Sequence, residues 1–242
     1  MQSQKQFKRR FSFEFFPPKT DQGKEKLQNV RNQLAEVNPD FFSVTFGAGG
    51  STRDRTIETV LNLHSQGIST APHLSCVGGT RQEIGELLDL YREHGINRIV
   101  ALRGDMPSGM GAAGELRYAN ELVEFIREHS GDTFNLEVAA YPEFHPQARN
   151  AEEDLKNFAR KVQAGANSAI TQYFFNADSY FYFIDRLEKM GVTIPVVPGI
   201  MPIVNFSNLV RFSDMCGAEI PRWIRKQLEA YGDDSDSIRQ FG

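Results

Sequence analysis

Short apolar β-type runs recur along this chain at a nearly constant interval, and this regularity constrains the fold more than any other feature. The runs start about 30 residues apart, the length of one strand, one helix and two loops. Their short, almost continuous apolar character indicates burial on both faces, as in a parallel sheet. Seven strands are predicted, at Phe11–Phe15, Phe41–Thr45, Thr70–Leu74, Arg98–Leu102, Leu136–Ala140, Ala169–Thr171 and Ile194–Val197.

Helical stripes fill the intervals between these runs. Leu27, Val30, Leu34 and Val37, for example, are spaced to share one helix face. Uninterrupted alternation of strands and helices predicts an α/β fold. A doubly wound sheet and a (β/α)8 TIM barrel both fit this class, and the even spacing over 242 residues favours the barrel.

An eighth strand–helix unit is missing from the pattern. After the seventh strand we expect two helices, at about Asn205–Cys216 and Pro221–Ala230, and then an acidic stretch, Gly232–Asp236. Three explanations stay open: the C-terminus is truncated, another chain closes the barrel, or the strand count is wrong by one. We expect a single catalytic barrel domain over residues 1–242, truncated at its C-terminus, with residues 1–10 as a polar extension.

Composition excludes several classes of protein. With 40% hydrophobic and 24% charged residues, the chain is neither disordered nor of low complexity. No apolar run is long enough for a membrane span, and no secretory signal is visible. Two cysteines, Cys76 and Cys216, cannot build a disulfide framework or a four-thiolate zinc site. A net charge of −4 argues against nucleic-acid binding, so we expect a soluble cytoplasmic protein.

Polar residues cluster at the predicted C-terminal ends of the strands, where barrels of this kind carry their active sites. Any one of them could be an ordinary loop residue, but together they predict a site. They are Glu14, Thr45, His73, Arg103, Asp105, Tyr141, His145 and Gln172.

Glu14 stands out in this set because it lies within the aromatic run Phe13–Phe16. A carboxyl group among phenylalanine side chains is expected to be desolvated, which would raise its pKa and suit it to general acid catalysis. The alternative is a buried glutamate paired with an arginine.

A metal or a conventional dinucleotide site is not expected. His73, His145, Glu14 and Asp105 could meet, but the chain has no paired-histidine metal motif. The glycine-rich loops at 47–50 and 109–114 match neither a Walker nor a Rossmann fingerprint, so a bound dinucleotide would be held in another way.

Six motifs then occur in a fixed order. Together they resemble the bacterial, FAD-dependent methylenetetrahydrofolate reductases, from about Phe11 to about Asp236. The motifs start at Ser12 (SFEFFPPK), Ser43 (SVTFGA), Ala71 (APHL), Ala101 (ALRGD), Ala140 (AYPEFHP) and Ile170 (ITQYFF).

The resemblance implies an oxidoreductase in a (β/α)8 barrel that binds FAD without a Rossmann domain. It implies reduction of 5,10-methylenetetrahydrofolate to 5-methyltetrahydrofolate, with electrons from NADH or NADPH through the flavin. The product would feed one-carbon metabolism and methionine biosynthesis. The implied partners are a small folate substrate and further copies of the chain in a homo-oligomer, with no nucleic acid and no membrane.

The resemblance also implies residue roles. Glu14 matches the family's general acid, and Asp105 matches the carboxylate between flavin and pterin. Gln172 matches a contact to folate or nicotinamide, and Phe212 an aromatic residue that packs on the nicotinamide. The residues matching FAD contacts are Thr45, His73, Leu102, Arg103, Gly104, Asp105, Tyr118, Ala119, Tyr141, His145, Asp154, Asn157, Arg160 and Lys161.

The chain departs from the family pattern at its C-terminal end, because family members carry a further strand and helix near the substrate. Two alternatives therefore stay open. One is a catalytically impaired barrel that still binds flavin or folate. The other is a folate-dependent methyltransferase barrel, which would lack flavin.

Overall fold

The computed structural model describes residues 1–47, 52–105 and 114–242. Of the two glycine-rich loops predicted at 47–50 and 109–114, all but Gly47 and Gly114 lie outside the described residues.

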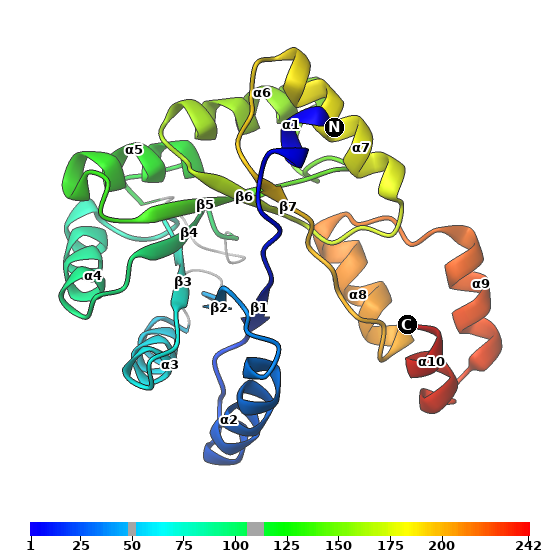
Figure 1. Cartoon of the computed structure of the whole chain (residues 1–242). Coiled ribbons are helices and arrows are strands. Elements are labelled where there is room, and N and C mark those ends of the chain that lie inside the picture. Colours follow the sequence, from blue (N-terminus) through cyan, green and yellow to red (C-terminus); the bar gives the residue numbers. More distant parts are fainter. Residues whose placement is uncertain (48–51, 106–113) are drawn as a thin grey trace. The chain divides into compact units, whose positions relative to one another are not determined.

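Seven strands form where the sequence predicts them, and every boundary lies within two residues of the expected one (Figure 1). Most of their apolar residues are buried, as the continuous apolar runs predicted. The strands are β1 (Ser12–Phe15), β2 (Phe41–Val44), β3 (Thr70–Ser75), β4 (Arg98–Leu102), β5 (Asn135–Ala140), β6 (Ser168–Thr171) and β7 (Val196–Val197).

Helices occupy the intervals between the strands. The Thr80 side chain starts one of them with a capping box, accepting from the Glu83 N–H while the Glu83 carboxylate accepts from the Thr80 N–H. The helices are α1 (Gln2–Lys5), α2 (Asp21–Ala35), α3 (Arg53–Ser65), α4 (Arg81–Glu93), α5 (Ala119–Ser130), α6 (Ala151–Gln163), α7 (Ala177–Lys189), α8 (Phe206–Cys216), α9 (Arg222–Tyr231) and α10 (Ser235–Phe241).

The order of the strands decides between the two architectures. They are hydrogen-bonded in chain order from β1 to β7; β1 to β5 pair in parallel, as do β6 and β7. A doubly wound sheet would reverse its strand order part-way through the chain. The topology is therefore that of a (β/α)8 barrel, with seven strands in the described residues. This confirms the predicted fold class, including the absence of an eighth unit there.

The chain packs into two compact units, which we describe separately. The larger unit comprises residues 8–138 and 161–168, and the smaller unit comprises residues 1–7, 139–160 and 169–242. In the larger unit, the Phe42 ring stacks between Phe13 and Phe15, with ring centroids 5.9 and 5.2 Å away. Helices α3 and α5 pack on the neighbouring strands β3 and β4.

The smaller unit contains β6, β7 and the C-terminal helices α8, α9 and α10 (Figure 1). An apolar cluster joins these helices to the loop after β7. Its buried members are Ile203, Leu209, Ile220, Ile224, Leu228 and Ile238.

Two helices were not predicted. Helix α10 begins inside the acidic stretch, because the Asp234 side chain accepts from the backbone N–H groups of Asp236 and Ser237 and caps it. Helix α1 lies in the predicted polar extension, where the Gln4 side chain bonds to the backbone of Ile194 and Val196. The described part of the chain has no helix long and apolar enough to cross a membrane.

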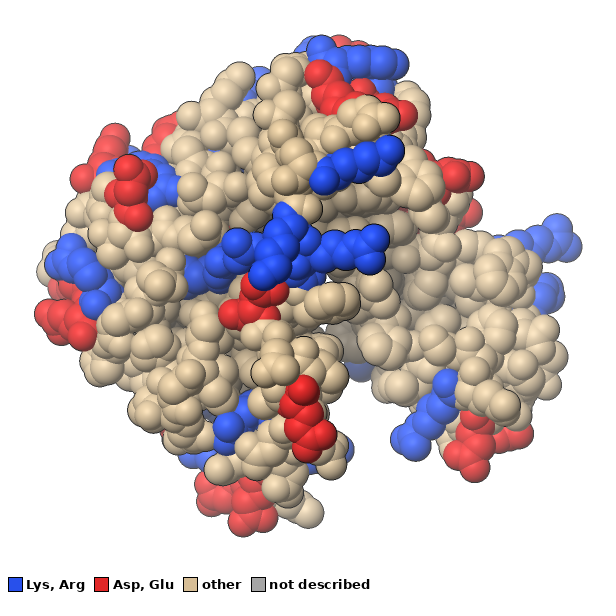
Figure 2. All heavy atoms as spheres, in the orientation of Figure 1, with Lys and Arg blue, Asp and Glu red and all other residues tan. Residues whose placement is uncertain are grey.

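Basic side chains gather in the middle of one face, where the stretch leading into β1 runs (Figures 1 and 2). In that stretch Lys8, Arg9 and Arg10 are all exposed, and Arg10 Nη1 lies 3.7 Å from Asp40 Oδ1. These residues precede β1, whereas barrel sites form after the strands. They therefore lie at the opposite strand ends from Arg103, which follows β4 in the same unit.

Candidate active site

Ten of the predicted site residues belong to the larger unit. Most lie in the C-terminal part of a strand or just after one, and these strands pair in parallel, so the residues lie toward the same edge of the sheet. They are Glu14, Thr45, His73, Leu102, Arg103, Gly104, Asp105, Tyr118, Ala119 and Lys161.

Glu14 and His73 form the most distinctive pair in this unit. Glu14 Oε2 lies 3.3 Å from His73 Nε2, across the strand β2 that separates β1 from β3. The Glu14 side chain is 50% exposed, whereas His73 is buried. His73 Nε2 has no well-aligned hydrogen bond among the described residues, so it is a buried polar atom with bonding capacity to spare.

The expectation of a raised pKa for Glu14 is wrong. Burial raises the pKa of this carboxyl, but close contact with the His73 imidazole lowers it by more, so the pKa lies below its ordinary value. The sequence argument failed because neighbouring strand residues project to opposite faces. Phe13 and Phe15 stack on Phe42, while Glu14 points the other way, toward His73. Among the described residues, the group that contacts the Glu14 carboxylate is His73 and not the arginine of the alternative prediction.

The ends of β3 and β4 are locked together beside this pair. The Ser75 hydroxyl donates to the Arg103 carbonyl over 2.8 Å, and the Val77 N–H donates to the same oxygen over 3.0 Å. Gly104 has a φ of +87°, and a Cβ there would lie 1.8 Å from Ser75 Oγ. The backbone therefore makes its turn before Asp105 only because position 104 has no side chain. Asp105 itself is exposed.

The remaining FAD-matching residues of this unit lie at element ends. Thr45 follows β2, and its carbonyl accepts from the Thr56 hydroxyl over 2.9 Å. Tyr118 is the exposed N-cap residue of α5, and Ala119 is the first residue of that helix.

The other predicted residues belong to the smaller unit. The Tyr141 and His145 rings meet edge to face with centroids 4.6 Å apart, and the His145 N–H donates to Asp154 Oδ2 over 3.0 Å. In α6, Arg160 Nη1 donates to Asn157 Oδ1 over 2.5 Å. The structure thus brings these five residues together in two local groups.

Gln172 and Phe212 complete the predicted set. The Gln172 N–H donates to the Ala140 carbonyl over 2.8 Å, and its side-chain oxygen accepts from the Tyr173 N–H over 3.0 Å. Phe212 lies on α8 with its ring 36% exposed, next to Ser213, which is buried.

Sequence reasoning missed a group of polar residues around α8. Tyr173 and Ser213 bond through their hydroxyls over 3.0 Å, and Glu143 Oε2 accepts from the Glu219 N–H over 2.8 Å. The signal was available, because Glu143 lies inside the quoted motif that starts at Ala140. A carboxylate among Tyr, Pro and Phe residues there could have been singled out as Glu14 was.

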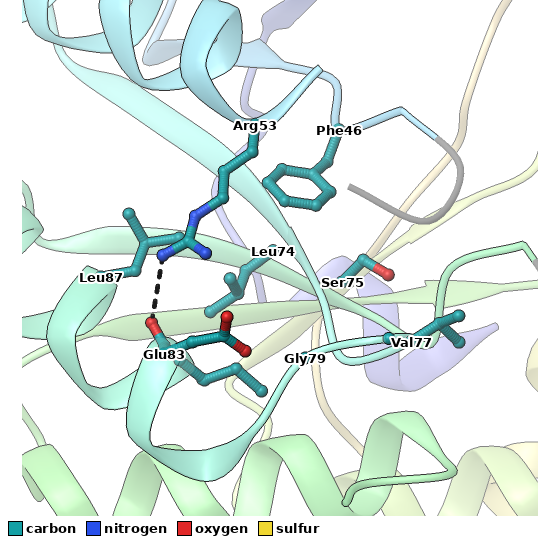
Figure 3. A pocket seen from close by; sticks show the side chains of 10 residues that line it. Phe46, Arg53, Leu74, Ser75, Val77, Gly79, Glu83 and Leu87 are labelled. Atoms are coloured by element: carbon teal, nitrogen blue, oxygen red, sulfur yellow. Dashed lines mark hydrogen bonds between the residues drawn. The ribbon is translucent and has the colours of Figure 1, made fainter. Parts of the chain in front are cut away.

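A pocket of about 240 Å³ opens beside the end of β3 (Figure 3). In it the Arg53 guanidinium extends from the start of α3 toward α4, where Nη2 lies 3.4 Å from the Glu83 carbonyl oxygen. Its described lining includes none of the predicted site residues. Leu74 lines this pocket while the preceding His73 faces Glu14, as alternation along a strand requires.

Comparison with known proteins decides the family. The family model described as methylenetetrahydrofolate reductase matches residues 1–242, the whole chain. The chain belongs to this family. The resemblance carried by the six motifs is therefore confirmed.

Relatives in the reductase family are similar over nearly all of this chain. It is 42% identical over 232 residues to the 5,10-methylenetetrahydrofolate reductase of Escherichia coli K12, covering 96% of this chain and 77% of that protein. It is 37% identical over 246 residues to methylenetetrahydrofolate reductase (NADH) 1 of Zea mays, covering 42% of that longer protein.

A solved structure supports the fold of the reductase chain. An uncharacterised protein from Clostridium thermocellum, described as binding two copies of 5-methyl-5,6,7,8-tetrahydrofolic acid, aligns over 95% of this chain and 79% of its own. The TM-score is 0.62 at 18% identity, which is evidence for a shared fold alone.

Proposed function

We propose that this chain is a flavin-dependent oxidoreductase that reduces 5,10-methylenetetrahydrofolate to 5-methyltetrahydrofolate with NADH or NADPH. We treat residues 1–242 as one catalytic domain acting in the cytoplasm, where its product would feed methionine biosynthesis. The observation that carries this proposal is the 42% identity to the Escherichia coli enzyme over 96% of the chain. The Glu14–His73 pair at the strand ends supports it.

The residues present fit a flavin. His73 Nε2 is a buried polar atom without a well-aligned partner, as expected where a ligand supplies one. A planar ring needs flat or apolar walls and a pyrophosphate needs cations, and the FAD-matching residues include both. When bound, FAD would supply the hydride transfer that no amino-acid side chain can perform. The proposed basic contacts to its pyrophosphate are Arg103, Arg160 and Lys161.

Glu14 is proposed to deliver the proton that opens the five-membered ring of the substrate at N10. Its lowered pKa in the free protein does not prevent this role, because half of the side chain is exposed and a bound folate would cover it. Covering a carboxylate with an apolar ligand removes water and raises its pKa. Until then, the nearby His73 imidazole, 3.3 Å away, keeps the pKa of Glu14 low.

Asp105, Gln172 and Phe212 are proposed to position the reactants. The exposed carboxylate of Asp105 would stabilise the positive charge that develops on the opened folate. Gln172 offers a side-chain NH₂ group as a donor to a pterin or carboxamide, since its oxygen already accepts from Tyr173. The half-exposed Phe212 ring would pack on the nicotinamide.

The test is a visible absorption spectrum of the purified protein followed by two anaerobic additions. We expect oxidised flavin absorption, bleaching by NADH or NADPH, and recovery on addition of methylenetetrahydrofolate. A yellow protein that bleaches but does not recover would favour the impaired barrel. A colourless protein that binds folate would overturn the proposal in favour of a methyltransferase-like barrel.

A further inference from the structure

Helix α8 is fastened at two places within the smaller unit. Along its length, the Ser213 hydroxyl bonds to the Tyr173 hydroxyl over 3.0 Å, directly after β6. At its C-terminal end, the chain turns through Gly217 at φ +73°, where an added Cβ would lie 2.7 Å from Pro146 Cγ. The end of α8 is therefore packed tightly against the loop after β5, with no room for adjustment.

Glu143 makes the polar bond at this second place. From the loop after β5, its Oε2 accepts from the Glu219 N–H over 2.8 Å, joining positions 76 residues apart in the chain. Its other oxygen, Oε1, is buried and has no partner among the described residues. Oε2 of the carboxyl thus stabilises the contact through a hydrogen bond, whereas Oε1 is desolvated without a compensating bond, which is unfavourable.

The electrostatic setting of Glu143 is unfavourable for a purely structural residue. Burial raises its pKa; the bond from the Glu219 N–H lowers it, and the negative charge of Glu219 raises it again, leaving it above the ordinary value. A glutamine could accept the same backbone bond without a charge to desolvate. A costly group that a neutral one could replace is characteristic of functional sites.

The bond lies close to both residues proposed to touch the reactants. One small cavity is lined by Glu143, Gln172 and Tyr173 together with Gly217 at the end of α8. Gln172 directly precedes Tyr173, and Phe212 directly precedes Ser213, so each proposed contact residue is adjacent to one end of the Tyr173–Ser213 bond. Loosening α8 would therefore displace Phe212 relative to Gln172.

We propose that Glu143 is a positioning residue, which clamps the end of α8 onto the loop after β5 and so fixes Phe212 and Gln172 for the nicotinamide. This inference rests on the proposed function, because those two residues receive their roles there. Glu143 touches neither reactant; it acts through α8.

The test compares Glu143→Ala with Glu143→Gln in the flavin-loaded full chain. Removing a hydrogen bond to a charged acceptor should speed hydrogen exchange at the Glu219 amide by about 10- to 100-fold in the alanine variant. The glutamine variant should restore most of that protection. In anaerobic flavin reduction, the alanine variant should need about tenfold more NADH or NADPH for half-maximal rate, with a similar limiting rate.

Ile126→Val is the matched stability control, since it trims a buried side chain of α5 in the larger unit and leaves the apolar cluster on α8 unchanged. When its Tm is lowered as much as that of Glu143→Ala, this control should still reach half-maximal rate at the wild-type concentration of NADH or NADPH. If it raises the requirement as much as Glu143→Ala does, general destabilisation explains the effect and the proposal is overturned.

Two further outcomes separate this inference from the proposed function. If neither nucleotide reduces the wild-type flavin, the proposed function is wrong and the role of Glu143 falls with it. The other outcome is that the wild-type flavin is reduced normally and Glu143→Ala has the same hydrogen exchange at the Glu219 amide and the same NADH or NADPH concentration for half-maximal rate. In that case only the assignment of Glu143 is wrong.

Discussion

The carboxyl group of Glu14 is influenced in opposite directions by its surroundings. Burial raises its pKa, and His73 at 3.3 Å lowers it by more. A carboxyl with a lowered folded-state pKa stabilises the fold above its unfolded pKa, and this contribution is lost as the pH falls through the folded pKa. His73 therefore lowers the pH at which Glu14 takes up a proton in the free protein.

Replacing His73 with glutamine should raise the pKa of Glu14, because burial would then act without the opposing imidazole. A carboxyl-carbon NMR titration of wild type and His73→Gln would measure the shift. Glu83 serves as an internal reference, since its pKa is lowered by its own bonds to Thr80. An unchanged Glu14 titration would show that His73 does not control it.

Glu14→Gln should separate the two halves of the proposed reaction. Glutamine keeps the size of the side chain but cannot donate a proton as an acid. Flavin reduction by nucleotide should stay near the wild-type rate, while reoxidation by methylenetetrahydrofolate should slow by about 10² to 10⁴. Stopped-flow absorbance measures both steps; equal loss in the two would assign Glu14 a structural role instead.

Strands were easier to predict than the polar helices at the chain ends. Runs such as Arg98–Leu102 are buried on both faces, so their apolar composition alone marks them, and β4 has the predicted bounds. Helix α10 contains only one buried residue, Ile238, and depends on the Asp234 cap, so its composition resembles that of a loop. The candidate residues were found from strand-end positions and motifs. Their contacts, such as His73 with Glu14, depend on register and side-chain direction and could not be read from the sequence.

Helix α6 offers a test of the proposed pyrophosphate contact. Lys161→Glu should lower the amount of flavin bound per protein, because it reverses a charge that the phosphates would need. Lys156→Glu on the same helix is the matched control: Lys156 is exposed and pairs with Glu152 at 3.0 Å. The ratio of flavin to protein absorbance measures the effect. Equal flavin content in both variants would place the pyrophosphate elsewhere.

At the scale of the whole chain, the edge of β7 affects whether copies of the chain associate. An incomplete barrel has strand edges with unpaired backbone groups, which favour aggregation or oligomers. In the smaller unit, however, the Val196 N–H donates to Gln4 Oε1 over 2.9 Å, and the Tyr180 hydroxyl donates to the Val196 carbonyl over 2.7 Å. Two side chains thus satisfy the backbone groups that a further strand would bind.

Gln4→Leu should uncover this edge and promote self-association. The leucine side chain is of similar size but cannot make either of the two bonds to the β7 region. Sedimentation over a range of protein concentrations should show larger species than in the wild type. Gln2→Leu adds the same apolar group at an exposed position of α1 and should behave as the wild type does. If both variants associate equally, added hydrophobic surface is the cause.

The contact between Gly104 and Ser75 restricts which substitutions these two positions can accept during evolution. A side chain at position 104 would overlap the Ser75 hydroxyl at 1.8 Å, and the backbone there is left-handed at φ +87°. Position 104 therefore cannot gain a side chain unless position 75 loses its own. In a library randomised at both, selection for folded protein should return glycine at 104 with nearly any small residue at 75. Alanine at 104 should appear only beside glycine at 75. A substitution at 104 would therefore be tolerated only after a substitution at 75.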